Sequence, residues 1–182
     1  MMIWRGGVGR VHLFRMPSLT HLNIRALEGA AEREWCAQLM VSSEPWLTLG
    51  RTVEQSRRAM QDPSREVYLA VEGGEPVGFI ILTLTGPLPG YIQTVCVAPE
   101  HRGRGVGAQL LAFAEARIFG KSPNVFLCVS SFNVDARRLY ERSGYVLVGE
   151  LKDYLVAGHG ELLFRKTRGP LSEFTAPDPG GR

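Results

Sequence analysis

The sequence is poor in the features that mark several common classes of protein. It has three cysteines, with no CxxC pair, and its four histidines share no zinc-ligand spacing. No apolar run approaches the roughly 18 residues of a membrane span. The net charge is only +3, from 21 Lys and Arg residues against 18 Asp and Glu residues. We therefore expect no metal, no membrane span and no nucleic-acid partner. We also expect free buried thiols in a reducing, cytoplasmic compartment, at Cys36, Cys96 and Cys128.

Length and composition predict a single globular domain. The chain has 182 residues, of which 45% are hydrophobic and 21% charged, enough for one well-buried core. Residues 1–18 form a basic N-terminal extension that lacks the apolar stretch of a signal peptide. Residues 169–182 are rich in proline and glycine, which is typical of a disordered tail. The domain is expected at residues 19–168.

Hydrophobic periodicity predicts a mixed α/β domain built around one sheet. A first helix is expected between Glu28 and Pro45, and Thr52 with Gln55 has the pattern of a capping box for a second. Gly144 is placed to end the last helix. The other helices are expected at 105–119 and 133–142, and strands at 21–26, 66–72, 76–85, 91–97, 124–129, 145–152 and 161–166.

Glycine is abundant, at 21 of 182 residues, and its densest cluster has chemical meaning. Gly103, Gly105 and Gly107 lie between an apolar strand and an apolar helix. Glycines at such a turn let a ligand approach the backbone, and the first N–H groups of a helix attract anions. Arg102 and Arg104 add positive charge at the same place. The segment therefore predicts a site for a phosphate or pyrophosphate.

Other interpretations of this loop are weaker. A plain glycine-rich turn needs neither three glycines nor two arginines. A P-loop requires Gly-Lys-Ser/Thr, which the segment lacks. A dinucleotide fingerprint formally fits Gly103, Gly105 and Ala108, but it should follow the first strand, and the next strand should end on a carboxylate. Neither condition is met.

Three segments in order resemble the GNAT superfamily of acetyl-CoA-dependent N-acetyltransferases. Residues 102–107 (RGRGVG) match its [Q/R]-x-x-G-x-[G/A] signature, residues 95–100 (VCVAPE) match the strand that leads into it, and residues 133–145 (NVDARRLYERSGY) match its second CoA-contacting motif. The resemblance covers residues 21–166 and is greatest to the branch that acetylates the alanine N-termini of ribosomal proteins. It implies a mostly antiparallel sheet of about seven strands, flanked by four helices, with the fourth and fifth strands splayed.

The resemblance also implies where acetyl-CoA binds. Its pantetheine arm would lie along the fourth strand, at Val95, Cys96 and Val97. Its pyrophosphate would bind the backbone of Arg102, Gly103, Arg104, Gly105, Val106, Gly107 and Ala108.

The helix that follows presents Asn133, Ala136 and Tyr140 on one face, because seven residues span nearly two full turns. In the family the asparagine contacts the cofactor and the tyrosine is the general acid for the departing thiolate. A phenol stays protonated near pH 7 and is suited to that role. Alternatively, Tyr140 packs in the core and Asn133 only caps the helix. Arg137 and Arg138 either touch the CoA phosphate or form a solvated face.

The general base is the point at which the sequence departs from the family. Many members carry a glutamate where this chain has Gln93, and an amide cannot act as a base. Either a water chain carries the proton to Glu150, Asp153 or Glu161, or the acceptor needs little help. An α-amine is roughly 10–15% neutral at pH 7, whereas a lysine side chain is roughly 0.04% neutral. This comparison favours an α-amine or another amine of low pKa.

In the family the acceptor site forms from the first two helices and the last hairpin, so the resemblance implies a site near Trp46, Tyr154, His159 and Glu161. The function so predicted is a cytoplasmic N-acetyltransferase that transfers acetyl directly from acetyl-CoA to a primary amine of a peptide or small molecule, as a monomer or homodimer. The alternatives are a non-catalytic acetyl-CoA-binding module of the same fold and a nucleotide-binding regulatory domain of Rossmann type.

Overall fold

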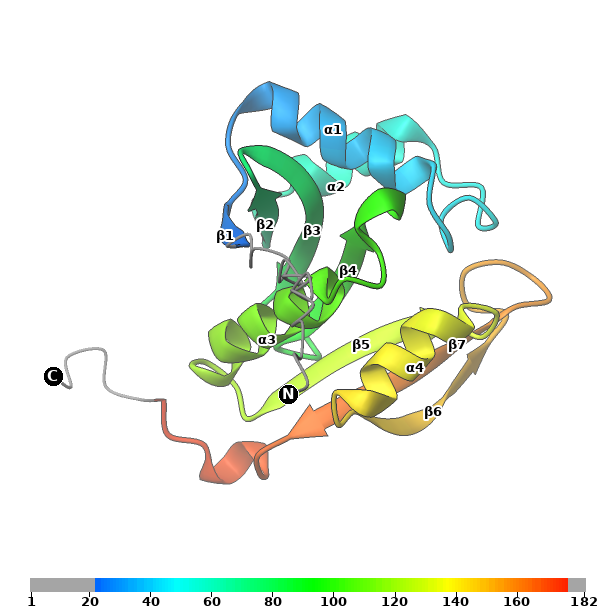
Figure 1. Cartoon of the computed structure of the whole chain (residues 1–182). Coiled ribbons are helices and arrows are strands. Elements are labelled where there is room, and N and C mark those ends of the chain that lie inside the picture. The colour runs from blue at the N-terminus through cyan, green and yellow to red at the C-terminus, as the bar shows by residue number, and fades with distance from the viewer. Residues whose placement is uncertain (1–21, 177–182) are drawn as a thin grey trace, which may run out of the picture.

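The computed structural model describes residues 22–176, which build one seven-stranded sheet with helices on both faces (Figure 1). The predicted N-terminal extension and residues 177–182 of the predicted tail lie outside the described residues. Residues 169–176 are described and include a short 3-10 helix. In chain order the elements are β1 (Asn23–Ala26), α1 (Gly29–Val41), α2 (Val53–Gln61), β2 (Arg65–Glu72), β3 (Glu75–Thr83), β4 (Tyr91–Val97), η1 (Pro99–His101), α3 (Val106–Phe119), β5 (Asn124–Ser130), α4 (Val134–Arg142), β6 (Val146–Lys152), β7 (Gly160–Thr167) and η2 (Leu171–Glu173).

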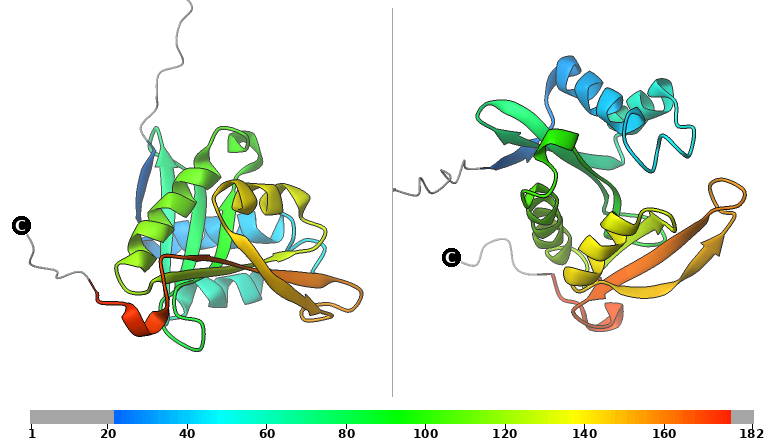
Figure 2. Two further views of the ribbon diagram at one scale, coloured as in Figure 1. Left: turned by 90° about the horizontal axis from the view of Figure 1, so that it is seen from below. Right: turned by 45° about the vertical axis from the view of Figure 1, so that its right-hand side comes forward.

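The sheet confirms the predicted mixed α/β class. Its strand order is β1-β2-β3-β4-β5-β7-β6, and every neighbouring pair is antiparallel except β4 and β5. The hairpin of β6 and β7 forms one edge and extends beyond the rest of the sheet (Figure 2). A dinucleotide-binding fold requires a doubly wound, mostly parallel sheet, so this topology rules out the Rossmann alternative.

The parallel contact between β4 and β5 is very short. Only Tyr91 and Ile92 of β4 have partners on β5, and beyond them the two strands diverge, as Figure 1 shows. The backbone N–H of Phe126 closes this junction by donating to the carbonyl of Gly90 over 2.9 Å. On the side that faces β5, the second half of β4 therefore has no strand partner among residues 22–176.

A bulge in β4 lies just where this divergence begins. In the ladder with β3, Ile81 pairs with Thr94 and the next residue, Leu82, pairs with Ile92, so Gln93 is the extra residue. One inserted residue reverses the alternation of side chains along a strand. Ile92 and Val95 consequently pack on the same face of the sheet, although they are three residues apart.

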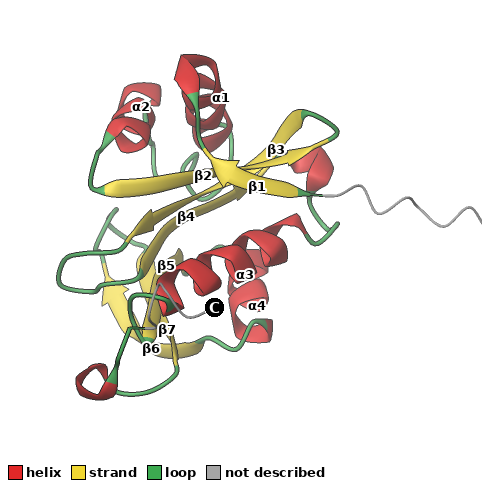
Figure 3. Cartoon of the chain, turned by 90° about the vertical axis from the view of Figure 1, so that its left-hand side faces the viewer, coloured by secondary structure: helices red, strands yellow, loops and turns green. Residues whose placement is uncertain are grey.

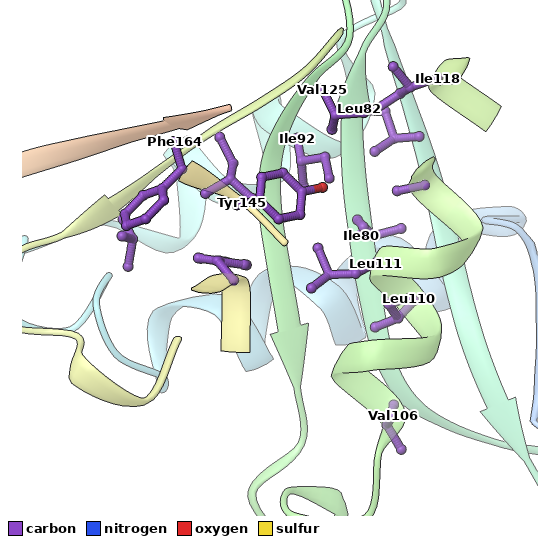
Figure 4. Close-up of a cluster of buried hydrophobic side chains, with 14 of the residues drawn as sticks. Ile80, Leu82, Ile92, Val106, Leu110, Leu111, Ile118, Val125, Tyr145 and Phe164 are labelled. Atoms are coloured by element: carbon purple, nitrogen blue, oxygen red, sulfur yellow. The ribbon is translucent and has the colours of Figure 1, made fainter. Parts of the chain in front are cut away.

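Each face of the sheet has its own core. The larger core packs α3 and α4 against the sheet; Figure 4 shows side chains of α3 meeting Ile80 and Leu82 of β3 and Ile92 of β4. The second core lies under α1 and α2 and includes Cys36, Met40, Met60 and Phe79. Figure 3 shows the two helix pairs on opposite sides of the sheet. This layering leaves the gap between β4 and β5 to be bordered by α4.

The residues predicted to begin α2 and to end α4 are confirmed. Thr52 accepts a hydrogen bond from the backbone N–H of Gln55, and the Gln55 side chain accepts one from Thr52, which completes the capping box of α2. Gly144 follows α4 with a φ of 86°, as a C-terminal glycine does. The predicted strand 76–85 ends earlier, at Thr83, where the chain enters the loop to β4.

The predicted buried thiols are found at two of three positions. Cys36 and Cys96 are buried, whereas Cys128 is only half-buried, and all three are free. Cys128 differs because its side chain faces a cavity between β4 and β5 rather than a core. Within residues 22–176, no helix is long and apolar enough to cross a membrane.

We expect the junction of β4 and β5 to be sensitive to a single methyl group at Gly90. Its φ is +87°, and a Cβ there would lie 2.5 Å from both the Asn124 carbonyl oxygen and the Ile118 side chain. Gly86 in the same loop has a φ of +102° but open space around it. Both alanine variants carry left-handed strain of about 1–2 kcal/mol. Only Gly90→Ala adds the cost of overpacking, about 1–3 kcal/mol.

Urea unfolding of Gly90→Ala and Gly86→Ala measures this difference directly, with Gly86→Ala as the matched control. Equal losses of unfolding free energy would show that the close approach of the two strands at Gly90 does not constrain the fold.

Candidate functional site

A large cavity of about 1060 Å³ opens along the diverging half of β4. Its walls are β4, the start of α3 and one side of α4. The predicted cofactor-binding residues meet here from segments up to 45 positions apart in the sequence. All but Arg104 line it, namely Val95, Cys96, Val97, Arg102, Gly103, Gly105, Val106, Gly107, Ala108, Asn133, Ala136 and Tyr140.

One end of this first cavity is built as an anion site. Gly103 and Gly105 adopt φ values of 71° and 85°, which let the chain turn directly into α3. No side chain caps α3 at Gly105, and its first turn contains no acidic residue. The N–H groups of that turn have no acceptor within the helix, and the helix dipole makes them attractive to anions. The local backbone therefore has the form of a phosphate-binding helix start.

The two arginines of the glycine loop have different contacts. Arg102 donates to the Val97 carbonyl over 3.0 Å and to the Ser43 hydroxyl over 3.2 Å, so its side chain ties the loop to β4 and to the end of α1. Arg104 instead forms an ion pair of 3.0 Å with Glu72 and contacts His101. The Arg104 side chain is engaged there, which explains why it does not line the cavity.

Helix α4 contributes both of the polar groups that the sequence singled out. The Asn133 side chain caps α4 by accepting from the N–H of Ala136 over 3.3 Å. Tyr140 is buried, and its ring packs edge-on against Tyr145 with centroids 6.0 Å apart. Burial raises the pKa of Tyr140 above its usual range, so the phenol keeps its proton at neutral pH. Both residues nevertheless line cavities. Asn133 therefore does more than cap the helix, and Tyr140 does more than pack in the core.

A second cavity of about 880 Å³ lies beside the first. It extends over the β4–β5 junction toward α2 and the β6–β7 connection. The two cavities share five lining residues, which are Trp46, Val95, Asn133, Ala136 and Tyr140. The two cavities thus adjoin along these five residues, and Tyr140 carries the phenol among them.

Gln93, on the bulge of β4, lines the second cavity. Its side-chain oxygen is buried and has no hydrogen-bond partner among residues 22–176. An unpaired buried acceptor costs about 1–3 kcal/mol, so such a group is suited to meet an N–H donor from a ligand. The position that the sequence identified as lacking a base therefore still presents a hydrogen-bond acceptor.

Of the three carboxylates considered as distant bases, only Glu161 lines the second cavity. It is 4% exposed on β7 and accepts a hydrogen bond from Ser130 on β5 over 2.5 Å. Burial raises the pKa of Glu161 above its usual range. Glu150 is exposed, and Asp153, also exposed, binds the N–H of Gly158. The register of β5 and β7, which pairs Ser130 with Glu161, thus places only one of the three carboxyl groups at this cavity.

The other expected acceptor residues are only partly brought together. Trp46 lines both cavities, and Tyr154 lines the second with 64% of its surface exposed. His159 packs edge-on against Phe132 and lines neither cavity. Among the described residues, no group of three His, Cys, Asp or Glu side chains is placed to hold a metal ion.

Several cavity residues escaped the sequence analysis. Tyr91 could have been found, because it lies two residues before Gln93 and so on the same face of the predicted strand that leads into the glycine loop. Arg51, Arg65, Cys128 and Ser130 also line the second cavity, and no local signal marks them. Their placement depends on pairing between strands that are distant in the sequence.

Comparison with known proteins places this arrangement in a family. The model of the acetyltransferase (GNAT) family matches residues 27–145. The N-alpha-acetyltransferase RimI of Mycobacterium tuberculosis is 30% identical over 140 residues, which cover 75% of this chain and 84% of that protein. An aminoalkylphosphonate N-acetyltransferase of Salmonella typhimurium is 38% identical over 92 residues, 46% of this chain and 58% of the relative. An aminoglycoside 6'-N-acetyltransferase crystallised with coenzyme A shares the fold, with a TM-score of 0.66, 17% identity, and coverage of 81% and 98%.

The burial of Glu161 predicts a pH-dependent cost to stability. Because its pKa is raised in the folded chain, the folded state holds the proton more tightly than the unfolded state. The contribution of Glu161 to stability therefore falls as pH rises from about 4.5 through the folded pKa. Glu161→Gln removes the charge but can still accept from Ser130. We expect the melting temperature of the variant, relative to the parent, to increase over this pH interval.

Thermal melts from pH 4 to pH 8 test this expectation, with Glu150→Gln on the exposed face of β6 as the control. A difference between Glu161→Gln and the parent that stays constant or shrinks with rising pH would contradict the buried placement of this carboxyl group.

Proposed function

We propose that this chain, which belongs to the acetyltransferase (GNAT) family, transfers the acetyl group of acetyl-CoA directly to a primary amine. The observation that carries the proposal is the meeting of two cavities at Tyr140. A direct transfer needs both substrates bound at once, with the thioester and the amine at a shared boundary.

Acetyl-CoA is assigned to the first cavity. The N–H groups at the start of α3 would hold its pyrophosphate, as helix starts commonly do. Its pantetheine arm carries amide groups, and β4 offers backbone groups from Gln93 to Val97 that have no strand partner on the β5 side among residues 22–176. The arm would take the place of a missing strand and direct the thioester toward Asn133 and Tyr140.

Tyr140 is assigned as the general acid. In the reaction the amine nitrogen attacks the thioester carbonyl carbon, a C–N bond forms, and the C–S bond breaks. The departing CoA thiolate takes the phenolic proton of Tyr140. The new amide nitrogen loses one proton to a base through water, and an equivalent proton returns through water to the Tyr140 phenolate, so that the sum is amine and acetyl-CoA giving amide and CoA thiol. Burial keeps the phenol of Tyr140 protonated at neutral pH, so its proton is present when the thiolate leaves.

Gln93 and Glu161 are assigned to the amine. The unpaired Gln93 oxygen would accept an N–H of the acceptor and orient its lone pair. Glu161 would receive the released proton through water, because its carboxyl group lines the same cavity. A raised pKa brings a carboxylate closer to the pH at which it works as a base. Two relatives act on amines of different kinds, an N-terminal α-amine and an aminoalkylphosphonate, by their names.

An acetyl-CoA-binding module without catalysis is the second candidate. Gln93, in place of the usual glutamate, is the observation that favours it. The free cysteines support a cytoplasmic location for either function.

The first prediction for this site concerns ligand binding. At about 100 times its Kd, acetyl-CoA should add roughly 2.7 kcal/mol to the free energy of unfolding. For a chain of this size the melting temperature should rise by roughly 5–10 °C. NAD and ATP serve as matched controls in the same melt. Stabilisation by NAD or ATP, with none by acetyl-CoA, would overturn the assignment of the first cavity.

The second prediction concerns the general acid. Tyr140→Phe should lower kcat by about 10²- to 10⁴-fold, because it removes the proton donor to the thiolate, while the Kd for acetyl-CoA stays close to that of the parent. Tyr145→Phe is the control, since Tyr145 is a buried neighbour in ring contact that lines neither cavity. Thiol release with a panel of amines gives the rates. If the two variants have equal kcat values, Tyr140 is not the acid; if no amine releases thiol from the parent, the binding module is the better description.

A further inference from the structure

The second cavity has an uneven distribution of charge. Arg51 and Arg65 line one end of it, near α2 and the start of β2, whereas Glu161 lines it from β7. Most other lining residues are apolar or uncharged, among them Trp46, Leu49 and Pro87. A cavity for a simple cationic amine does not need two guanidinium groups.

Arg51 lacks an anionic partner. Its Nε donates to the Ser56 hydroxyl over 3.1 Å and its Nη2 donates to the Gln55 carbonyl over 3.3 Å, so the side chain is held in place by neutral groups. No carboxylate pairs with it in the part of the chain that the structure describes. It is half-buried, and both that burial and the nearby Arg65 lower the pKa of Arg51.

The neighbouring Arg65 has an anionic partner of its own. It pairs with Asp62 over 3.0 Å, which compensates one of the two guanidinium charges. The pair of arginines therefore carries one positive charge more than the described carboxylates offset. A half-buried, like-charged pair of this kind is unfavourable on its own and becomes favourable when an anion binds.

The register of the sheet places this charge close to Gln93, beside which the acetyl group would be transferred. Arg65 pairs with Thr83 on β3, and Thr83 pairs with Tyr91 on β4. Two strand spacings separate Arg65 from Tyr91, about 10 Å between their Cα atoms. Gln93 lies two residues further along β4 and lines the same cavity. A short acceptor can thus extend from Gln93 to the arginines.

We infer that the acceptor is a primary amine that carries an anionic group, either a carboxylate or a phosphonate or phosphate, and that Arg51 together with Arg65 binds this group. The inference rests on the proposed function and specifies its substrate class. The amine lies at Gln93 and Tyr140, the apolar middle of the cavity covers the linking carbons, and the anion lies between the guanidinium groups. Arginine suits such a group because its planar fork makes paired hydrogen bonds to carboxylate and phosphonate oxygens.

Matched amines that differ only in the anion provide the test. β-Alanine is compared with β-alanine amide, 3-aminopropylphosphonate with its diethyl ester, and two alanyl dipeptide amides with glutamate against glutamine in the second position. The third pair asks whether an acidic peptide supplies the anion instead of a small molecule. The measured quantity is the ratio of kcat/KM for the anionic member to kcat/KM for the neutral member.

The parent should favour the anionic member of at least one pair. In Arg51→Gln we expect that ratio to fall by about 10- to 100-fold, through a higher KM for the anionic amine. Arg65→Gln is a second, independent variant in case loss of the Arg51 hydrogen bonds disturbs the loop. Taking the ratio within each variant cancels the intrinsic reactivity of each amine and any general loss of activity.

Arg58→Gln is the control for charge removal. Arg58 lies on α2, its side chain is 76% exposed, it pairs with Glu54, and it lines neither cavity. The ratio should not change in this variant. A ratio that stays the same in both Arg51→Gln and Arg65→Gln, in an enzyme that acetylates neutral amines, overturns the inference and leaves the transferase intact. Absence of turnover with every amine, despite stabilisation by acetyl-CoA, overturns the proposed function and this inference with it.

Discussion

The separation of β4 from β5 is the constraint on which the rest of the molecule depends. In the middle of a sheet, each strand normally satisfies its neighbour's N–H and C=O groups, and leaving them unpaired is costly. Here pairing stops after two residues of β4, so backbone groups of a central strand are left without a sheet partner. The core under α3 and α4 includes residues from both halves of the sheet, and the core under α1 and α2 supports β2, β3 and β4 from the other face. Both halves are therefore held in place while the gap between β4 and β5 stays open. Both cavities exist because of that gap.

Several groups beside the gap are less favourable than ordinary packing would make them. The Gln93 oxygen has no partner among residues 22–176, the carboxyl group of Glu161 is buried, and Arg51 is half-buried next to another arginine. Each lowers the stability of the chain without ligands, and each would be relieved by a ligand of the right chemistry. Their clustering in one cavity, rather than across the surface, is what makes it a candidate site.

Different parts of the fold supply the polar groups of the two cavities. Helix α4 presents Asn133 and Tyr140 to both of them, and the start of α3 lines only the first, whose remaining wall is β4. The second cavity adds polar groups from strands and from the loop before α2, among them Gln93, Glu161 and Arg51. Loops are the positions at which proteins of one fold differ most readily.

The sequence alone determined the elements, the mixed class of the sheet, the glycine loop and the pairing of Asn133 with Tyr140 on one helix face. These follow from spacing along the chain, because a helix places residues seven apart on one side and a glycine loop acts through its own backbone. It did not determine which carboxyl group lines the second cavity, where Arg104 points, or that Arg51, Arg65 and Gln93 share a cavity. The positions of Glu161, Arg65 and Gln93 depend on strand register and on one inserted residue in β4, and Arg104 is held by its ion pair with Glu72 of β2. Register is set by packing across the whole sheet, so only the tertiary structure decided them.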